Sequence, residues 1–180
     1  WIMKFGSITT PIITDGLVFN MDAANRASYP KTGTVITDTI NSATGTFNGS
    51  TFINEDNGII NFDGTDDYID FDDILDLGIL SVNMWINCDV YNSGRQFLFG
   101  KWKSNYRSYS IVLNQSATSA GSITSQISTD GGSSNVGLAT YTGVINANST
   151  WFNIGMTNDG TNVKTYVNGI LGATTSIGGA

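Results

Sequence analysis

The sequence predicts an all-β fold, built as a two-sheet antiparallel β-sandwich. Short stretches alternate apolar and polar residues, which is the period of a strand with one buried face. Turn-forming residues separate about a dozen such stretches at intervals of roughly 8–12 residues, a spacing typical of sandwiches. No long stretch repeats apolar residues at helical spacing, and 180 residues suffice for one domain with a buried core.

The clearest strands lie in residues 149–173. Apolar and polar residues alternate on both sides of a turn at residues 158–160, and Asn168 with Gly169 marks a second turn. We expect Trp151 and Tyr166 on the opposite face from the core or at an edge. The side chains expected in the core are Phe152, Ile154, Met156, Val163 and Val167.

The N-terminal half offers weaker signals. Residues 1–15 look like an arm or edge strand, and residues 16–22 alternate as a strand. A loop follows, in which the bond between Tyr29 and Pro30 favours extended backbone. Further strands are predicted around residues 34–38, 44–52 and 59–62.

The middle of the chain contains one short irregular segment between strands. Residues 72–78 do not alternate cleanly and predict one helical turn, whereas residues 81–90 form a well-patterned strand with Cys88 on its buried face. Residues 96–101 and 108–114 are predicted strands joined by a loop that contains Trp102. Because Trp85 and Trp151 fall in strands, we expect their truncation to destabilise the fold more than truncation of Trp102. The remaining predicted strands are residues 122–129 and 136–141.

Composition excludes several classes of function. The formal net charge of −7 makes a nucleic-acid backbone an unsuitable partner, and no run of about 18 apolar residues is present to span a membrane. Cys88 is the single cysteine, so no disulfide forms within the chain. The absence of histidine removes Ser-His-Asp triads, Cys-His pairs and histidine-based zinc sites.

Four segments resemble the concanavalin A-like jelly roll of the laminin G-like type: GLVFNMDAANRASYP at 16–30, INFDGTDDYIDF at 60–71, SVNMWIN at 81–87 and WFNIGMTNDGTNVKTYVNG at 151–169. The version with Met21 to Asn25 followed by Ser28, Tyr29 and Pro30 is similar to domains of bacteriophage and marine viral structural proteins. The resemblance implies two stacked antiparallel sheets, binding of glycans or proteins, and in some members Ca²⁺ at the rim of the sandwich.

The resemblance also suggests domain limits. We expect an N-terminal arm or edge strand over residues 1–15 and a laminin G-like jelly roll over residues 16–180. Proteins of this type continue for about two more strands after the turn at Asn168 and Gly169. The domain is therefore expected to lack its last strands. Another part of a longer chain, the residues before Gly16 or a neighbouring subunit would then pair with the open edge.

An acidic run from Asp63 to Asp76 has two interpretations. Six to eight hard oxygen ligands make up a Ca²⁺ site, for which Asp63, Asp66 and Asp67 are the first candidates. Alternatively, these carboxylates satisfy turn amides and face solvent. Ca²⁺ is the one cofactor that the sequence suggests.

A second group of residues combines positive charge with aromatic rings. Sugar rings stack on exposed Trp and Tyr, while Lys and Arg bond hydroxyls or acidic sugars, so a glycan- or partner-binding loop is one interpretation. In the other, the charges only solvate a loop beside core phenylalanines. The residues are Arg95, Lys101, Trp102, Lys103, Tyr106 and Arg107.

Catalysis is not expected. Glycoside hydrolases of this sandwich type use paired carboxylates across the scissile bond, usually glutamates. This chain has a single glutamate, Glu55, in a predicted turn, and its aspartates cluster along one segment. Without histidine, no serine or cysteine has a general base.

We therefore expect a non-catalytic virion structural, decoration or attachment protein that contacts other virion or surface proteins and glycans. It would act as a homo-oligomer or as part of a larger assembly, located in the virion. The alternative is a carbohydrate-binding module of a secreted or cell-surface bacterial protein.

Overall fold

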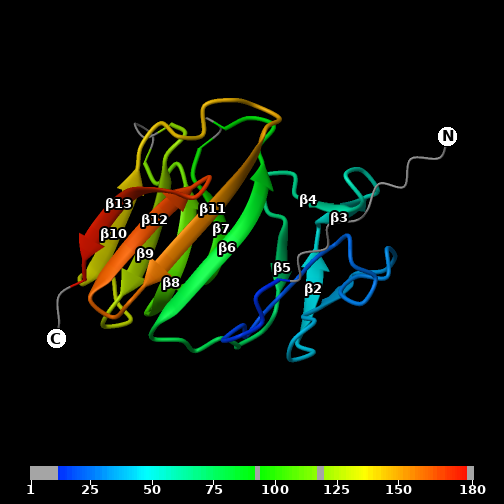
Figure 1. Cartoon of the computed structure of the whole chain (residues 1–180), viewed down its shortest axis with the longest axis horizontal. Helices are drawn as coiled ribbons and strands as arrows, with labels where there is room; N and C mark the ends of the chain where they lie inside the picture. The colour runs from blue at the N-terminus through cyan, green and yellow to red at the C-terminus, as the bar shows by residue number, and fades with distance from the viewer. Residues whose placement is uncertain (1–11, 92–93, 117–119, 178–180) are drawn as a thin grey trace. The chain divides into compact units, whose positions relative to one another are not determined.

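The computed structural model describes residues 12–91, 94–116 and 120–177, and all regular elements in these ranges are β-strands. The chain divides into two compact units, Trp1–Leu75 and Asp76–Ala180. The predicted all-β sandwich is confirmed, with the sandwich itself formed by the C-terminal unit (Figure 1). Among the described residues, no helix is long and apolar enough to cross a membrane.

The C-terminal unit consists of two four-stranded antiparallel sheets that lie face to face (Figure 1). We call them the β6 sheet, in the order β13-β12-β11-β6, and the β7 sheet, in the order β10-β9-β8-β7. The strands are β6 (Leu80–Asn87), β7 (Gln96–Lys103), β8 (Tyr106–Leu113), β9 (Ile123–Ser128), β10 (Val136–Tyr141), β11 (Trp151–Asn158), β12 (Asn162–Val167) and β13 (Ile170–Ser176).

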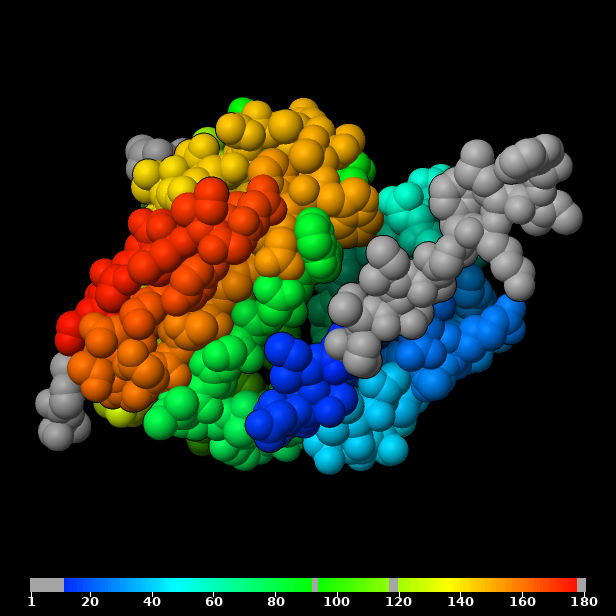
Figure 2. Space-filling view, viewed as in Figure 1, coloured from blue at the N-terminus to red at the C-terminus, as the bar shows by residue number. Residues whose placement is uncertain are grey.

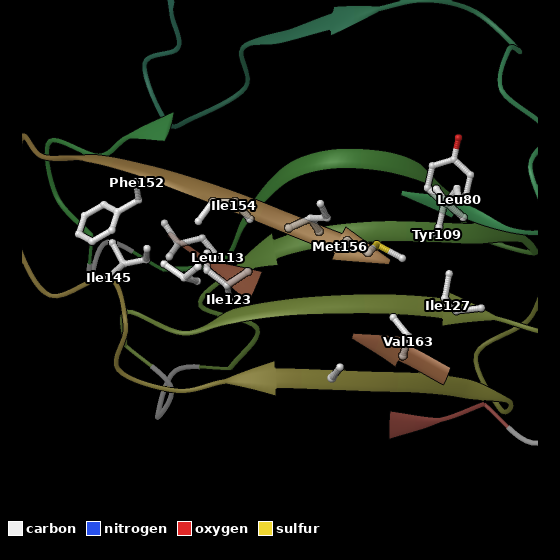
Figure 3. Close-up of a cluster of buried hydrophobic side chains, with 13 residues drawn as sticks. Leu80, Tyr109, Leu113, Ile123, Ile127, Ile145, Phe152, Ile154, Met156 and Val163 are labelled. Carbon is white, nitrogen blue, oxygen red and sulfur yellow. The ribbon is translucent and has the colours of Figure 1, made fainter. Parts of the chain in front are cut away.

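Alternating side chains of both sheets fill the core between them. Phe152, Ile154 and Met156 point from β11 toward the side chains of the β7 sheet, as Figure 3 shows. All five core residues predicted from residues 149–173 are buried, because period-two alternation places them on one face of adjacent strands. The β7 sheet contributes Tyr109, Ile111, Leu113, Ile123, Ile127 and Ala139.

Tight turns set the register of the β6 sheet. Asn168 and Gly169 join β12 to β13 with φ values of 50° and 76°, the left-handed pair that a two-residue hairpin requires. Between β11 and β12, the carboxylate of Asp159 accepts hydrogen bonds from the backbone N–H groups of Thr161 and Asn162. Both turns lie where the sequence predicts them.

The N-terminal unit has a smaller core. A three-stranded sheet has the order β1-β2-β5, and β3 pairs with β4 in a separate hairpin. Tyr29 stacks on Phe47 with ring centroids 5.3 Å apart, and its hydroxyl donates to the carbonyl oxygen of Gly33. The strands are β1 (Val35–Thr37), β2 (Thr44–Asn48), β3 (Thr51–Ile53), β4 (Ile59–Asn61) and β5 (Tyr68–Asp70).

Several predicted elements are corrected by the structure. Residues 16–22 form no strand, because the backbone N–H of Asn20 bonds to the buried carboxylate of Asp38 instead of to a neighbouring strand. Residues 72–78 form no helical turn and connect the two units as irregular backbone, with positive φ at Asp72 and Leu75. Trp102 lies inside β7 and Tyr106 begins β8, so the predicted loop shortens to residues 104–105.

The predicted domain limits remain a prediction. Most of the proposed N-terminal arm, residues 1–11, lies outside the described residues. In the described part, residues 12–14 belong to no strand.

Candidate functional site

The outer face of the β6 sheet carries exposed aromatic side chains. Trp85 on β6 is 64% exposed and Trp151 on β11 is 37% exposed, although both lie in strands. Tyr166 on β12 is half-buried on the same face. We call this surface, formed by Trp85, Trp151, Tyr166, Asn83 and Asn153, the tryptophan face. Figure 2 looks onto the β6 sheet, with β11 and β12 in orange and β13 in red lying side by side at the surface.

The strand register places Asn153 at the centre of this face. Trp85 is directly opposite Asn153 in the β6–β11 ladder, and Trp151 is two residues away on the same strand. Trp85 and Trp151 are thus diagonal neighbours, whose backbones lie about 7–8 Å apart. Tyr166 pairs with Gly155 and therefore lies diagonally to Asn153 on its other side.

Two amides form the polar part of the face. The Nδ2 of Asn83 donates to Oδ1 of Asn153 at 2.9 Å, and the Nδ2 of Asn153 donates to Oδ1 of Asn83 at 3.0 Å. The backbone N–H of Asn153 also donates to the side-chain oxygen of Asn168, at 2.9 Å. These bonds hold Asn153 in place beside the exposed indole of Trp85.

The tryptophan face is uncharged. Strands β6, β11 and β13 contain no charged residue. The single charged residue of β12, Lys164, lies 3.6 Å from the carboxylate of Asp159. The β7 strand of the other sheet, by contrast, carries Lys101 and Lys103.

The predicted acidic candidates do come together, in the N-terminal unit. Asp63, Asp66 and Asp67 can each place one carboxylate oxygen within 4.8 Å of the others. The backbone N–H of Asp63 donates to Asp67 Oδ2 at 2.8 Å, and that of Thr65 donates to Asp63 Oδ1 at 2.7 Å. Two of the three carboxylates, those of Asp63 and Asp67, therefore also bond turn amides, as the alternative interpretation predicts.

The cluster fits part of a Ca²⁺ coordination sphere. Its three hard carboxylate oxygens match the ligand type, and the remaining ligands would be carbonyl oxygens or water. Gly49 provides space for the Asp67 carboxylate. Its φ is +81°, and a Cβ at this position would lie 1.9 Å from that carboxylate. The three carboxylates therefore form a cluster that could hold a metal ion.

The six basic and aromatic candidates do not form one binding loop. Arg95 and Lys103 flank the two ends of β7, about 26 Å apart along an extended strand. Lys101 forms an ion pair with Asp76. The guanidinium of Arg107 lies over the Trp102 ring, 5.7 Å from its centroid, and that of Arg95 lies over Phe97 at 4.6 Å.

At the tip of the β7–β8 hairpin, only some of the predicted basic and aromatic side chains are exposed. Lys103 pairs with Tyr106 in the register, and Tyr106 is 77% exposed. Trp102 is half-buried beneath Arg107, so the indole is less accessible than that of Trp85. The expectation that Trp85 matters more for stability than Trp102 loses its basis, because both lie in strands and Trp85 is the more exposed.

Cys88 does not offer a reactive thiol. It is partly buried against the core of the C-terminal unit. Burial raises the pKa of the Cys88 thiol, and the neighbouring Asp89 carboxylate raises it further. The thiol is therefore protonated near neutral pH and is a weak nucleophile.

Sequence reasoning placed Trp151 and Tyr166 on the face opposite the core but did not assemble the tryptophan face. The missing information was the pairing of β6 with β11, which are separated by more than sixty residues in the chain. The available signal was the alternation in residues 81–87, which puts Asn83 and Trp85 on the side away from Val82 and Met84.

Comparison with known proteins agrees with the fold. The family model for the concanavalin A-like lectin/glucanases superfamily, of laminin G type, matches residues 63–180, more than half of the chain. No curated protein matches this chain. The match covers all eight strands of the sandwich. The chain belongs to the concanavalin A-like lectin/glucanases superfamily.

Proposed function

We propose that this protein is a non-catalytic carbohydrate-binding module that holds its ligand on the tryptophan face. The observation that carries the proposal is the exposure of Trp85 and Trp151 on one face of one sheet, around a pair of asparagine amides. The C–H face of a sugar ring is apolar, and its hydrogens match the negative face of an indole ring. The superfamily is compatible with carbohydrate or protein binding.

A protein partner fits this face less well. The centres of protein–protein interfaces are contiguous, well-packed apolar patches. Here the aromatic positions alternate with amides, since Asn153 lies between Trp85, Trp151 and Tyr166. Amides between exposed rings suit a ligand whose surface alternates C–H and O–H groups.

The proposal that the module is non-catalytic rests on its carboxylates. Strands β6, β11, β12 and β13 contain no Asp or Glu, so the tryptophan face lacks the acid and nucleophile of a glycosidase. Glu55, the single glutamate of the chain, lies in a turn of the N-terminal unit. A bound glycan is therefore expected to be released unchanged.

Affinity electrophoresis of the full chain through gels containing single polysaccharides tests the proposal. We expect retardation by at least one polysaccharide, and we expect Trp85→Ala to abolish it. Phe97→Ala is the matched control, because Phe97 is a 51% exposed aromatic residue on the other sheet. Migration unaffected by every polysaccharide would reject a carbohydrate-binding function, and release of reducing sugar from the retarding polysaccharide would reject its non-catalytic character.

A second candidate is a virion structural or attachment protein that acts through protein contacts, and one observation favours it. Ile170 and Leu171, 62% and 51% exposed, begin the edge strand β13. Exposed apolar residues on a strand edge invite pairing with another chain. We infer that such contacts would build a homo-oligomer or a larger assembly on a virion, whereas the carbohydrate-binding candidate would also suit a secreted or cell-surface protein.

Light scattering of the purified protein separates the two candidates. An oligomer that Leu171→Lys converts to a monomer, without loss of polysaccharide retardation, would support assembly through β13. A monomer at all concentrations up to about 100 μM, well above the Kd of a specific interface, would count against self-assembly.

We also propose Ca²⁺ as the ion for the acidic cluster. The proposal is supported by the gathering of Asp63, Asp66 and Asp67, whose oxygens are the ligands that Ca²⁺ prefers. Asp66 is the most informative position, because Asp63 and Asp67 also accept hydrogen bonds from the loop backbone.

A further inference from the structure

The amide pair at the centre of the tryptophan face limits the kind of carbohydrate it can take. Asn83 and Asn153 exchange two hydrogen bonds, so each amide uses one N–H and one oxygen lone pair on the other. The second N–H of Asn153 is directed to the carbonyl oxygen of Met84, at 3.4 Å. Asn83 is exposed, and among residues 12–91, 94–116 and 120–177 its second N–H has no further partner. The pair therefore offers one donor and the remaining oxygen lone pairs to a ligand.

Resting on the carbohydrate-binding function proposed above, we propose that the ligand is an uncharged glycan, and that Asn83 and Asn153 recognise two neighbouring hydroxyl groups of the sugar stacked on Trp85. A hydroxyl group both donates and accepts hydrogen bonds. Of two adjacent hydroxyls, one can accept from the free N–H of the amide pair while the other donates to a free lone pair of an amide oxygen. Trp85 lies directly opposite Asn153 in the ladder. A ring stacked on the indole therefore brings its polar edge to the amides.

Among the described residues, acidic glycans meet a single cation on this side of the β6 sheet, Lys164, which is already paired with a carboxylate. Carboxylate and sulfate groups only accept hydrogen bonds, and they would face the lone pairs of two amide oxygens. Lys164, the nearest cation on the sheet, lies 3.6 Å from Asp159. The net charge of −7 adds a general repulsion of polyanions. The other sheet has three cations, all on β7 and β8: Lys101, Lys103 and Arg107.

The ligand class is tested with two panels in the same electrophoresis: neutral β-glucan, mannan, galactan and xylan, and acidic alginate, polygalacturonate and chondroitin sulfate. We expect retardation by a neutral polysaccharide, with a Kd that changes less than about twofold between roughly 0.05 and 0.5 M NaCl, since no charge pair is made. Binding to the acidic panel alone, weakened by salt, would overturn this inference while leaving the carbohydrate-binding function intact. Binding to neither panel would instead reject the function itself.

The amide contact is tested with variants of Asn83. Asn83→Ala removes the whole amide, and Asn83→Asp keeps the shape but replaces both N–H groups, the free one and the one that donates to Asn153, with a charged acceptor. Because both are exposed substitutions, the melting temperature should stay near that of the wild type, and each should weaken binding of the neutral polysaccharide about tenfold, the loss of one good hydrogen bond. The O-methylated form of the same polysaccharide, which has lost its hydroxyl donors, should bind the wild type equally poorly.

Two results would overturn the assignment. Unchanged affinity in both Asn83 variants, together with loss of binding in Trp85→Ala, would show that the amides take no part in recognition. Loss of binding in Trp102→Ala with an unaffected Trp85→Ala would place the ligand on the β7–β8 hairpin instead.

Discussion

The two sheets of the sandwich share one core but differ in how exposed the side chains of their outer faces are. On the β7 sheet, Ser110, Thr124 and Gln126 alternate with core residues, yet they are 0–1% exposed. On the β6 sheet, the equivalent outward positions include Trp85, which is 64% exposed. One sheet thus buries polar side chains away from the core, and the other exposes its largest aromatic one.

Hydrogen bonding explains why the buried polar face is stable. The hydroxyl of Ser110 donates to Oε1 of Gln126 at 3.3 Å, and the amide of Gln126 donates to Gln115 at 2.5 Å. Thr124 and Thr140 lie 3.0 Å apart between their hydroxyls. Burial costs little stability when polar groups are hydrogen-bonded to one another. An exposed indole, by contrast, adds little to the stability of the fold. The difference places a bonded, buried polar surface on one sheet and the proposed binding face on the other.

Substitutions on the inner and the outer face of the β6 sheet should give the largest contrast. Ile154→Ala empties a fully buried position on β11 and is expected to lower the free energy of unfolding by about 2–5 kcal/mol. Trp85→Ala, on the neighbouring strand but exposed, should cost less than about 1 kcal/mol. Urea denaturation measures both. Comparable losses would mean that the tryptophan face contributes to the core and is not a free binding surface.

Polar truncations compare the two outer faces directly. Gln126→Ala should lower the free energy of unfolding by about 1–3 kcal/mol, because Ser110 and Gln115 each lose a buried partner. Asn83→Ala removes an amide of the exposed pair and should change stability by less than about 0.5 kcal/mol. If the order were reversed in urea denaturation, the assignment of stability and binding to separate sheets would fail.

The acidic cluster belongs to neither sheet and extends the comparison to the N-terminal unit. For a Kd of about 0.1–1 mM, typical of extracellular modules, 5 mM Ca²⁺ would stabilise the folded state by about 1–2 kcal/mol. We expect Ca²⁺ to raise the melting temperature, EDTA to reverse the rise, and Asp66→Asn to abolish it. Because Asp67 also accepts a loop hydrogen bond, Asp67→Asn should lower stability even without Ca²⁺. If neither Ca²⁺ nor EDTA changed the melting temperature, the carboxylates of the cluster would serve only to bond the amides of the turn.

The smallest effect concerns one turn of each sheet. Bonds from the backbone N–H of Gly132 lower the pKa of Asp130, and bonds from Asn162 and Thr161 lower the pKa of Asp159, in each case below the ordinary 3.8. A lowered pKa in the folded state stabilises the protein above the unfolded pKa, and this contribution disappears as the pH falls through the folded value. Asp159→Asn should therefore melt slightly below the wild type at pH 7.

The difference between Asp159→Asn and the wild type should shrink as the pH falls through the lowered folded pKa of Asp159, and vanish in acid where both side chains are neutral. Asp130→Asn serves as the parallel variant in the β9–β10 turn and should behave in the same way. A difference in melting temperature that persists unchanged from pH 7 to acid would show that charge is not its cause.

Much of the fold followed from local pattern. The alternation in residues 149–173 identified β11, β12 and their core side chains, and the Asn168–Gly169 turn was placed where the structure has it. The gathering of Asp63, Asp66 and Asp67 was also predicted, because these residues are close in sequence and lie in one loop. The prediction for residues 16–22 was wrong because their alternation matches a strand, whereas the backbone N–H of Asn20 bonds to the carboxylate of Asp38, a residue distant in sequence.

The sequence by itself determined the strand content, the superfamily resemblance and the two faces of each strand, because period-two alternation and turn chemistry are local properties. Only the tertiary structure decided which residues share a surface. It brought Trp85 beside Asn153 and Trp151 through the pairing of β6 with β11, and it separated Arg95 from Lys103 by the length of β7. Strand order and register depend on contacts between distant segments, and in this chain those contacts select the candidate binding face.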